Sequence, residues 1–217
     1  MFNILKEKGV DMKKYLYVFS ILVVTIFTFS IVNSTKSNKT VQTSSITIEN
    51  LSSKKIEWGI KRNDNHKQPD LGSLNKKIID EAKGIAMGNS ESKKVYLTFD
   101  EGYEAGYTQK ILEVLKQNEV KATFFITAHY VNSKPELVQK MIEEGHIIGN
   151  HTVNHKSMPS LTLEQIKSEV MNLHTAIYEK FGYEMKYIRP PKGEYSEKSV
   201  GYCNTLRLYN SNVVFCL

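Results

Sequence analysis

Cysteine is scarce in this sequence, with only two among 217 residues, Cys203 and Cys216, both near the C-terminus. Their spacing matches neither a metal site nor a disulfide framework. Internal repeats and long low-complexity tracts are also absent. A content of 41% hydrophobic and 24% charged residues is typical of an ordinary globular protein. The length therefore predicts one domain together with a targeting segment.

Acidic residues are the minority among the charged ones, with 23 Asp and Glu against 29 Lys and Arg, a net charge of +6. The basic residues are scattered, and no predicted helix carries a basic stripe with interleaved aromatics, so we expect no nucleic-acid partner. The positive charge suits an anionic cell wall or membrane surface. It is equally compatible with a simple contribution to solubility.

One long hydrophobic run is present, residues 15–32, directly after Lys13 and Lys14. It predicts a signal peptide or membrane anchor over residues 1–34. Its length lies between a signal-peptide core of about 7–15 residues and a spanning helix of about 20, so both alternatives stay open. We expect a linker over 35–57, a folded domain over 58–217, and an exported protein, in the cell wall or anchored to the membrane.

Strand-like and helix-like segments alternate in the second half of the chain. Strands are predicted over residues 94–99, 120–126, 146–149 and 187–189. Helices are predicted over 107–117, over 135–144, from a Thr162–Gln165 capping box onwards, and after the cap residue Ser196. The first strand, KVYLTF, is expected to be buried on both faces. This alternation predicts an α/β fold with a parallel sheet, whose functional residues gather at the carboxyl ends of the strands.

Two histidines, His151 and His155, follow the third predicted strand with a spacing of four. Neutral imidazoles at this spacing can bind one cation such as zinc, although such pairs are also common on protein surfaces. A carboxylate from another strand end would complete a metal site with open positions for water and substrate. The segment YLTFDEGYEAGYT, at the end of the first predicted strand, supplies carboxylates for such a site.

Three carboxylates, Asp100, Glu101 and Glu104, crowd the segment YLTFDEGYEAGYT. Crowded carboxylates raise one another's pKa unless a cation or a hydrogen-bond donor lies among them. Glu101 and Glu104 could instead cap the helix that follows. Arg189, at the end of the fourth predicted strand, has two interpretations: it orients a catalytic carboxylate through two parallel hydrogen bonds, or it is a surface arginine at a turn.

Three segments in order, 98–102 (TFDEG), 151–155 (HTVNH) and 189–193 (RPPKG), resemble the first three motifs of the polysaccharide deacetylases of carbohydrate esterase family 4, the NodB-homology domain. The pattern from Phe99 to Thr108, FDEGYEAGYT, and Lys192 with Gly193 narrow the resemblance to the delta-lactam-biosynthetic peptidoglycan deacetylases. These enzymes remove the acetyl group of N-acetylmuramic acid in spore-cortex wall. The resemblance implies a distorted (β/α) barrel and peptidoglycan glycan strands as substrate.

The resemblance also implies the roles of the site residues. Asp100 would be the general base, oriented by Arg189. His151 and His155 would hold a divalent metal, with zinc as the expected ion. Glu101 stands where the wider family has an aspartate ligand, so it is expected to be a metal ligand or a close neighbour of the metal. The substrate and oxyanion site would include three further residues: Tyr195, Pro190 and Gly193.

The family pattern stops after Gly193, because no Asp-and-Trp motif and no Leu-x-His motif follow. We therefore expect a C-terminally truncated domain, about half to two-thirds of the barrel, with impaired activity. Two alternatives remain: a deacetylase of chitin-like N-acetylglucosamine polymers, and a carbohydrate-binding remnant without catalytic activity.

Overall fold

The computed structural model describes residues 48–65, 67–206 and 212–213. It separates a compact unit, Asn50–Leu217, from Met1–Glu49, and the fold presented below is that of the compact unit. The predicted signal or anchor segment, residues 1–34, lies outside the described residues. Within the described part of the chain, no helix combines the length and the apolar character needed to cross a membrane.

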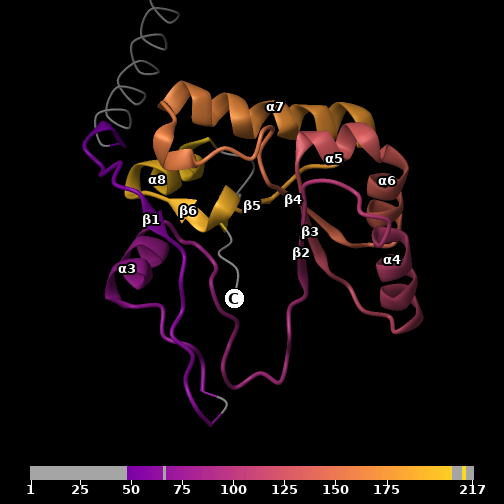
Figure 1. Cartoon of the computed structure of the whole chain (residues 1–217), viewed down its shortest axis with the longest axis horizontal. Helices are drawn as coiled ribbons and strands as arrows, with labels where there is room; N and C mark the ends of the chain where they lie inside the picture. Colours follow the sequence, from indigo (N-terminus) through magenta and orange to yellow (C-terminus); the bar gives the residue numbers. More distant parts are fainter. Residues whose placement is uncertain (1–47, 66, 207–211, 214–217) are drawn as a thin grey trace, which may run out of the picture. The chain divides into compact units, whose positions relative to one another are not determined.

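A five-stranded sheet forms the centre of the unit, and each strand runs parallel to its neighbours. Its strand order is β2 (Thr98–Glu101), β3 (Thr123–Ile126), β4 (Ile147–Asn150), β5 (Tyr187–Ile188) and β7 (Asn212–Val213). The predicted α/β fold with a parallel sheet is confirmed (Figure 1). Among the described residues the sheet remains open, since its edge strands β2 and β7 do not pair with each other.

The start of the first predicted strand was wrong. Strand β2 begins only at Thr98, and the preceding Val95, Tyr96 and Leu97 are exposed by 86%, 71% and 41%. The partner strand β3 begins at Thr123, opposite Thr98. Only the carbonyl of Leu97 still bonds to β3, accepting from the Thr123 N–H at 3.0 Å. Residues 94–96 have the composition of a strand but lie beyond the start of β3, and β-propensity alone does not produce a strand there.

Four helices follow the strands, namely α4 (Thr108–Gln117), α5 (Ala128–Ser133), α6 (Pro135–Glu143) and α7 (Leu163–Phe181). Their apolar stripes pack with Phe124, Ile126 and Ile148 of the sheet into one core cluster. The predicted helix with Pro135 at its start is confirmed, and so is the Thr162–Gln165 capping box at the start of α7. Figure 1 shows α4 and α6 beside strands β2 and β3.

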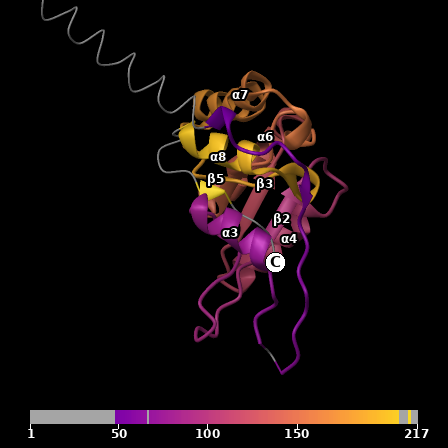
Figure 2. The ribbon, with the colours of Figure 1, turned by 90° about the vertical axis from the view of Figure 1, so that its left-hand side faces the viewer.

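A second core cluster lies around α3 (Ser73–Glu81), which the sequence did not predict, and α8 (Glu197–Thr205). The predicted start of α8 after the cap residue Ser196 is confirmed. Both helices face the viewer in Figure 2. The last residues of the predicted linker form β1 (Ile56–Glu57), which pairs antiparallel with β6 (Glu194–Tyr195). The folded unit thus includes the end of the segment predicted as a linker. Two 3₁₀ turns, η1 (Met158–Ser160) and η2 (Pro191–Gly193), complete this region.

The sheet face opposite the helices is packed by Phe125, Gly149 and Arg189. The guanidinium carbon of Arg189 lies 4.0 Å from the centre of the Phe125 ring. A Cβ atom on Gly149 would overlap two carbons of that ring, so the absence of a side chain at residue 149 is what lets Phe125 lie flat against the sheet. The contact between the Phe125 ring and the guanidinium helps to hold Arg189 in place.

We expect the substitution Gly149→Ala to destabilise the protein by about 1–3 kcal/mol, the usual cost of forcing an extra methyl group into a packed core. Urea unfolding would measure this. Gly59→Ala is a matched control, because a Cβ at residue 59 meets nothing within 4 Å. Equal stability of the two variants would contradict the packing described for Phe125.

Candidate active site

Asp100, His151 and Arg189 meet at the carboxyl ends of three strands, as the sequence predicts. Asp100 lies near the end of β2, His151 directly follows β4, and Arg189 directly follows β5. The Nη1 atom of Arg189 donates to Oδ1 of Asp100 at 2.6 Å. The other carboxylate oxygen, Oδ2, lies 3.9 Å from Nε2 of His151. One oxygen of Asp100 is therefore held by the arginine, and the other faces the histidine.

The two histidines converge on a common point, with 3.1 Å between their Nε2 atoms. Nδ1 of His151 lies 2.9 Å from the backbone oxygen of Arg189. Because a carbonyl oxygen can only accept, Nδ1 carries the proton, and the lone pair of Nε2 is directed toward His155. This is the arrangement in which an imidazole binds a metal through one nitrogen while a hydrogen bond fixes the other.

A strained turn holds His155 in place. Thr152 and His155 adopt positive φ values of 68° and 52°, a conformation that costs side-chain-bearing residues about 1–3 kcal/mol and persists only where neighbouring contacts impose it. Oδ1 of Asn150 accepts from the Thr152 N–H at 2.9 Å, and Oγ1 of Thr152 accepts from the His155 N–H at 3.1 Å. The buried Asn150 thereby anchors the turn to strand β4.

A second anchor joins the same turn to helix α7. The carboxylate of Glu169 accepts from the backbone N–H of Asn154 at 2.7 Å and from its side-chain amide at 2.8 Å. Glu169 is only 5% exposed, so these bonds, with Lys156 at 3.4 Å, compensate its burial. The histidine turn is thus fixed at both sides.

Burial is the main cause that lowers the pKa of His151, and the negative charge of Asp100 opposes it in part. His151 is therefore neutral at pH 7, the state in which imidazole binds metals. Arg189 is 5% exposed, and its Nε and Nη2 atoms have no hydrogen-bond partner among the described residues. Its stacking on Phe125 partly replaces the lost hydration.

Glu101 lies beside this group without joining it. No hydrogen bond or ion pair of its carboxylate is found within the described ranges. Burial, followed by repulsion from Glu104 and Asp100, raises the pKa of Glu101 from 4.5 to about 7. No set of three or more His, Cys, Asp or Glu side chains arranged to hold a metal ion occurs in the described part of the chain. Glu101 as a metal ligand remains a prediction.

The three residues expected at the substrate and oxyanion site lie further along the chain after Arg189. Pro190 is buried, directly next to Arg189. Gly193 packs against Trp58, whose backbone N–H donates to the Gly193 carbonyl at 2.7 Å. Tyr195 is fully buried in β6, and its hydroxyl donates to Oδ1 of Asn75 at 2.6 Å. Their predicted roles in substrate binding stay predictions.

A hollow of about 810 Å³ opens over the strand ends and is called the strand-end pocket below. Its lining consists of Asp100, Gly102, Tyr103, Ala105, Thr127, His129, His151, Val153, Asn154 and His155. Sequence reasoning missed Tyr103, His129 and Asn154 as lining residues. His129 could have been found, since it follows the second predicted strand and carboxyl ends of parallel strands share one edge.

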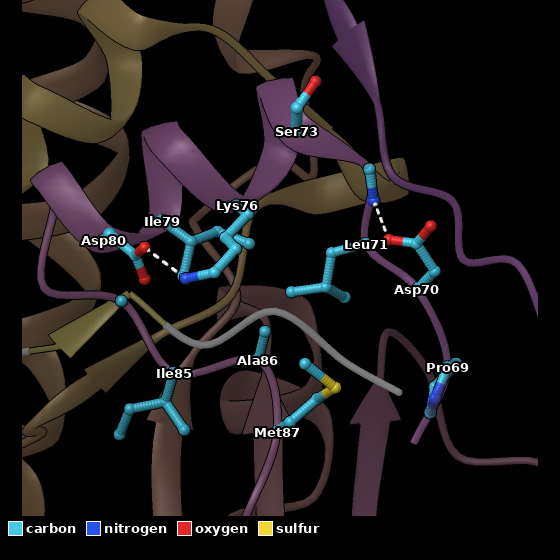
Figure 3. Close-up of a pocket in the computed structure, with 12 residues that line it drawn as sticks. Pro69, Asp70, Leu71, Ser73, Lys76, Ile79, Asp80, Ile85, Ala86 and Met87 are labelled. Carbon is cyan, nitrogen blue, oxygen red and sulfur yellow. Dashed lines mark hydrogen bonds and ion pairs between the residues drawn. The ribbon is translucent and has the colours of Figure 1, made fainter. Parts of the chain in front are cut away.

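Another hollow lies at the start of helix α3 (Figure 3). Its charged side chains are already paired, because Asp70 accepts from the Gly72 N–H at 2.8 Å and Lys76 binds Asp80 at 2.6 Å. It contains no histidine that could activate a nucleophile such as the Ser73 hydroxyl. The strand-end pocket, which brings a base, an arginine and two imidazoles together, is therefore the candidate active site.

The sequence matches the family described as polysaccharide deacetylase over residues 87–210. The chain belongs to the polysaccharide deacetylase family. The matched span contains Asp100, both histidines and Arg189, so the strand-end pocket lies within the part of the chain that matches the family.

Two curated polysaccharide deacetylases illustrate the similarity. The chain is 42% identical to the peptidoglycan-N-acetylmuramic acid deacetylase PdaA of Bacillus subtilis over 154 residues, which are 68% of this chain and 59% of that protein. It is 36% identical to a peptidoglycan-N-acetylglucosamine deacetylase of Bacillus cereus over 113 residues, 52% of this chain and 41% of that protein. The chain thus spans less than two thirds of these relatives.

Solved structures agree with the fold. The structure of Bacillus subtilis PdaA, a family 4 carbohydrate esterase, matches with a TM-score of 0.72 at 39% identity, covering 76% of this chain and 70% of that one. A family 4 carbohydrate esterase from Bacillus anthracis matches with a TM-score of 0.68 at 35% identity, covering 76% and 74%. The parallel sheet with its covering helices is therefore that of the polysaccharide deacetylases.

The raised pKa of Glu101 predicts a pH dependence of stability in metal-free protein. Because folding favours the protonated form of Glu101, its contribution to stability is full below pH 4.5 and is lost as the pH rises through about 7. The substitution Glu101→Gln should therefore stabilise the protein at pH 8 relative to the wild type. The advantage should shrink toward acid pH.

Urea unfolding of chelator-treated protein across this pH range would measure the effect. Glu91→Gln, at an exposed glutamate, is the control and should change stability little at any pH. Parallel stability curves for wild type and Glu101→Gln would contradict the burial described for this carboxylate.

Proposed function

We propose that this protein hydrolyses the N-acetyl group of an amino sugar in peptidoglycan. The observation that carries the proposal is the position of Asp100, whose Oδ1 is held by Arg189 at 2.6 Å while Oδ2 faces the histidine pair. A fixed carboxylate beside two converging imidazoles suits the activation of water for attack on an amide carbonyl. The names of the relatives, both peptidoglycan deacetylases, support the choice of substrate.

In the proposed reaction Asp100 is the general base. Its Oδ2 accepts a proton from the attacking water, and Arg189 keeps the carboxylate from rotating away. The side chain of Asp100 is 47% exposed, so water and substrate reach it through the strand-end pocket. A backbone N–H near Tyr195 is proposed to stabilise the oxyanion, a contribution of roughly 2.7–4 kcal/mol in enzymes where it has been measured.

The histidine pair is suited to a divalent metal, for which we propose zinc. Two nitrogens 3.1 Å apart can both lie about 2.0–2.1 Å from one zinc ion. His151 is neutral and its tautomer presents Nε2, and the strained turn holds His155 opposite. A bound divalent metal would polarise the acetyl carbonyl and lower the pKa of water. Glu101 is proposed as its third ligand or as a close neighbour.

The finer assignments rest on the resemblance of the motifs. We propose N-acetylmuramic acid as the sugar, in delta-lactam synthesis during sporulation, and an exported protein with a signal peptide or membrane anchor in residues 1–34. A deacetylase of chitin-like N-acetylglucosamine polymers is the alternative substrate class, and a carbohydrate-binding protein without catalysis is the alternative function.

Acetate release from isolated peptidoglycan tests the proposal. We expect Asp100→Asn to lower acetate release by at least about 100-fold, the typical contribution of a general base, while zinc binding is retained. Ser168→Ala, on the exposed side of helix α7, is the control. Analysis of the product for free muramic or glucosamine amines separates the two sugars, and glycan binding without acetate release would favour the non-catalytic alternative.

Removal of the metal gives a separate prediction. We expect one zinc ion per chain to bind to the wild type in isothermal titration calorimetry and none to bind to His151→Ala combined with His155→Ala, because the only pair of converging imidazoles in the described part of the chain is then lost. A chelator should abolish acetate release by the wild type, and added zinc should restore it. Unchanged zinc binding by the double variant would contradict the assignment of the histidines.

A further inference from the structure

Tyr103 is a large aromatic residue exposed at the strand-end pocket. The side chain is 70% exposed although it is large and aromatic, and it lines the strand-end pocket together with Asp100 and both histidines. Its immediate neighbour Gly102 also lines this pocket, and a Cβ atom built there meets nothing within 4 Å. An aromatic ring thus stands beside open space at the entrance to the candidate catalytic groups.

The loop that carries Tyr103 is held by the carboxylate of Glu104. Oε1 of Glu104 accepts from the N–H of Gly106 at 2.5 Å and from the N–H of Thr108, the first residue of α4, at 3.3 Å. Oε2 accepts from the hydroxyl of the buried Tyr130 at 3.0 Å. Although partial burial acts in the opposite direction, these bonds lower the pKa of Glu104. The carboxylate therefore joins the loop to two helices.

We propose that Tyr103 is a stacking platform for the pyranose ring of the amino sugar, and that Glu104 is the positioning residue that holds this platform in place. The inference rests on the proposed function and names the group that binds the sugar. A pyranose ring has apolar C–H faces, and a tyrosine ring offers a large apolar surface at a small cost in conformational entropy. Since Glu104 fixes the loop before binding, little order has to be gained on binding.

Tyr107 supplies a matched control on the same loop. It is 66% exposed, close to the 70% of Tyr103, but it precedes helix α4 and is not among the residues that line the strand-end pocket. The two tyrosines have the same chemistry and nearly the same exposure, and differ in the surface that they face. A general effect of losing an exposed aromatic ring would be the same for both.

Binding of a soluble N-acetylated glycan oligomer, prepared by enzymatic digestion of peptidoglycan, to the full chain tests the platform. By isothermal titration calorimetry we expect Tyr103→Ala to weaken binding by about 10-fold, in the range of a buried aromatic contact at an interface. Tyr103→Phe should bind within about 2-fold of the wild type, since the ring is kept. Tyr107→Ala should bind as the wild type does. Equal affinities of Tyr103→Ala and wild type, or equal losses in both Ala variants, would overturn the inference.

A double-variant comparison tests the role of Glu104. We expect Glu104→Ala to weaken binding and Glu104→Gln, which still offers an acceptor to the two backbone N–H groups, to restore most of it. If Glu104 acts through Tyr103, Tyr103→Ala combined with Glu104→Ala binds no more weakly than Tyr103→Ala alone. Additive losses would show that Glu104 acts independently of Tyr103.

The binding readout separates this inference from the proposed function. Wild type that binds the glycan with the expected loss in Tyr103→Ala, but releases no acetate, would support the platform while contradicting the proposed hydrolysis. Wild type that releases acetate while Tyr103→Ala binds unchanged would contradict the platform alone. A wild type that does not bind the glycan at all would overturn the platform.

Discussion

The ion pair between Asp100 and Arg189 is the interaction on which the candidate site depends. The two residues are 89 positions apart in the sequence, and they meet because parallel pairing brings the carboxyl ends of β2, β4 and β5 to one edge of the sheet. Burial of Arg189 beneath Asp100 is possible because Phe125 lies flat against Gly149 and supports the guanidinium. The position of Asp100 therefore depends on the packing of Phe125 against Gly149, because that packing supports the arginine that holds Asp100.

The sequence was informative where a local pattern decides the structure. The capping box at Thr162 and the proline at residue 135 set the starts of helices α7 and α6 without help from distant residues. The carboxyl ends of the strands were predicted to within two residues from where the hydrophobic runs stop, although β2 continues through Asp100 and Glu101 and β4 through Asn150. From those ends, the rule that parallel strands share one edge was sufficient to bring Asp100, His151 and Arg189 together.

The features that could not be predicted depend on contacts between distant segments. Residues 94–96 have the composition of a strand, but β3 begins opposite Thr98 and does not extend beside them. The antiparallel pairing of β1 with β6 joins the end of a polar linker to Glu194 and Tyr195. No local sequence pattern predicts this pairing. Glu104 was expected either to belong to a charged cluster or to cap the helix that follows, and its bond to the Thr108 N–H at the start of α4 agrees with the second alternative. Its hydrogen bond with the hydroxyl of Tyr130 could not be predicted, because the two residues are 26 positions apart and meet only when β3 places helix α5 beside the loop.

Residue 189 acts on both halves of the candidate site, through two different parts of its structure. Its guanidinium holds Asp100, while its backbone carbonyl accepts from His151 and sets which imidazole nitrogen is free. A point mutation can replace the guanidinium, but every amino acid keeps the carbonyl. A substitution at residue 189 can therefore release Asp100 from its ion pair while leaving His151 with the same nitrogen free, so the two halves of the candidate site can change independently in evolution.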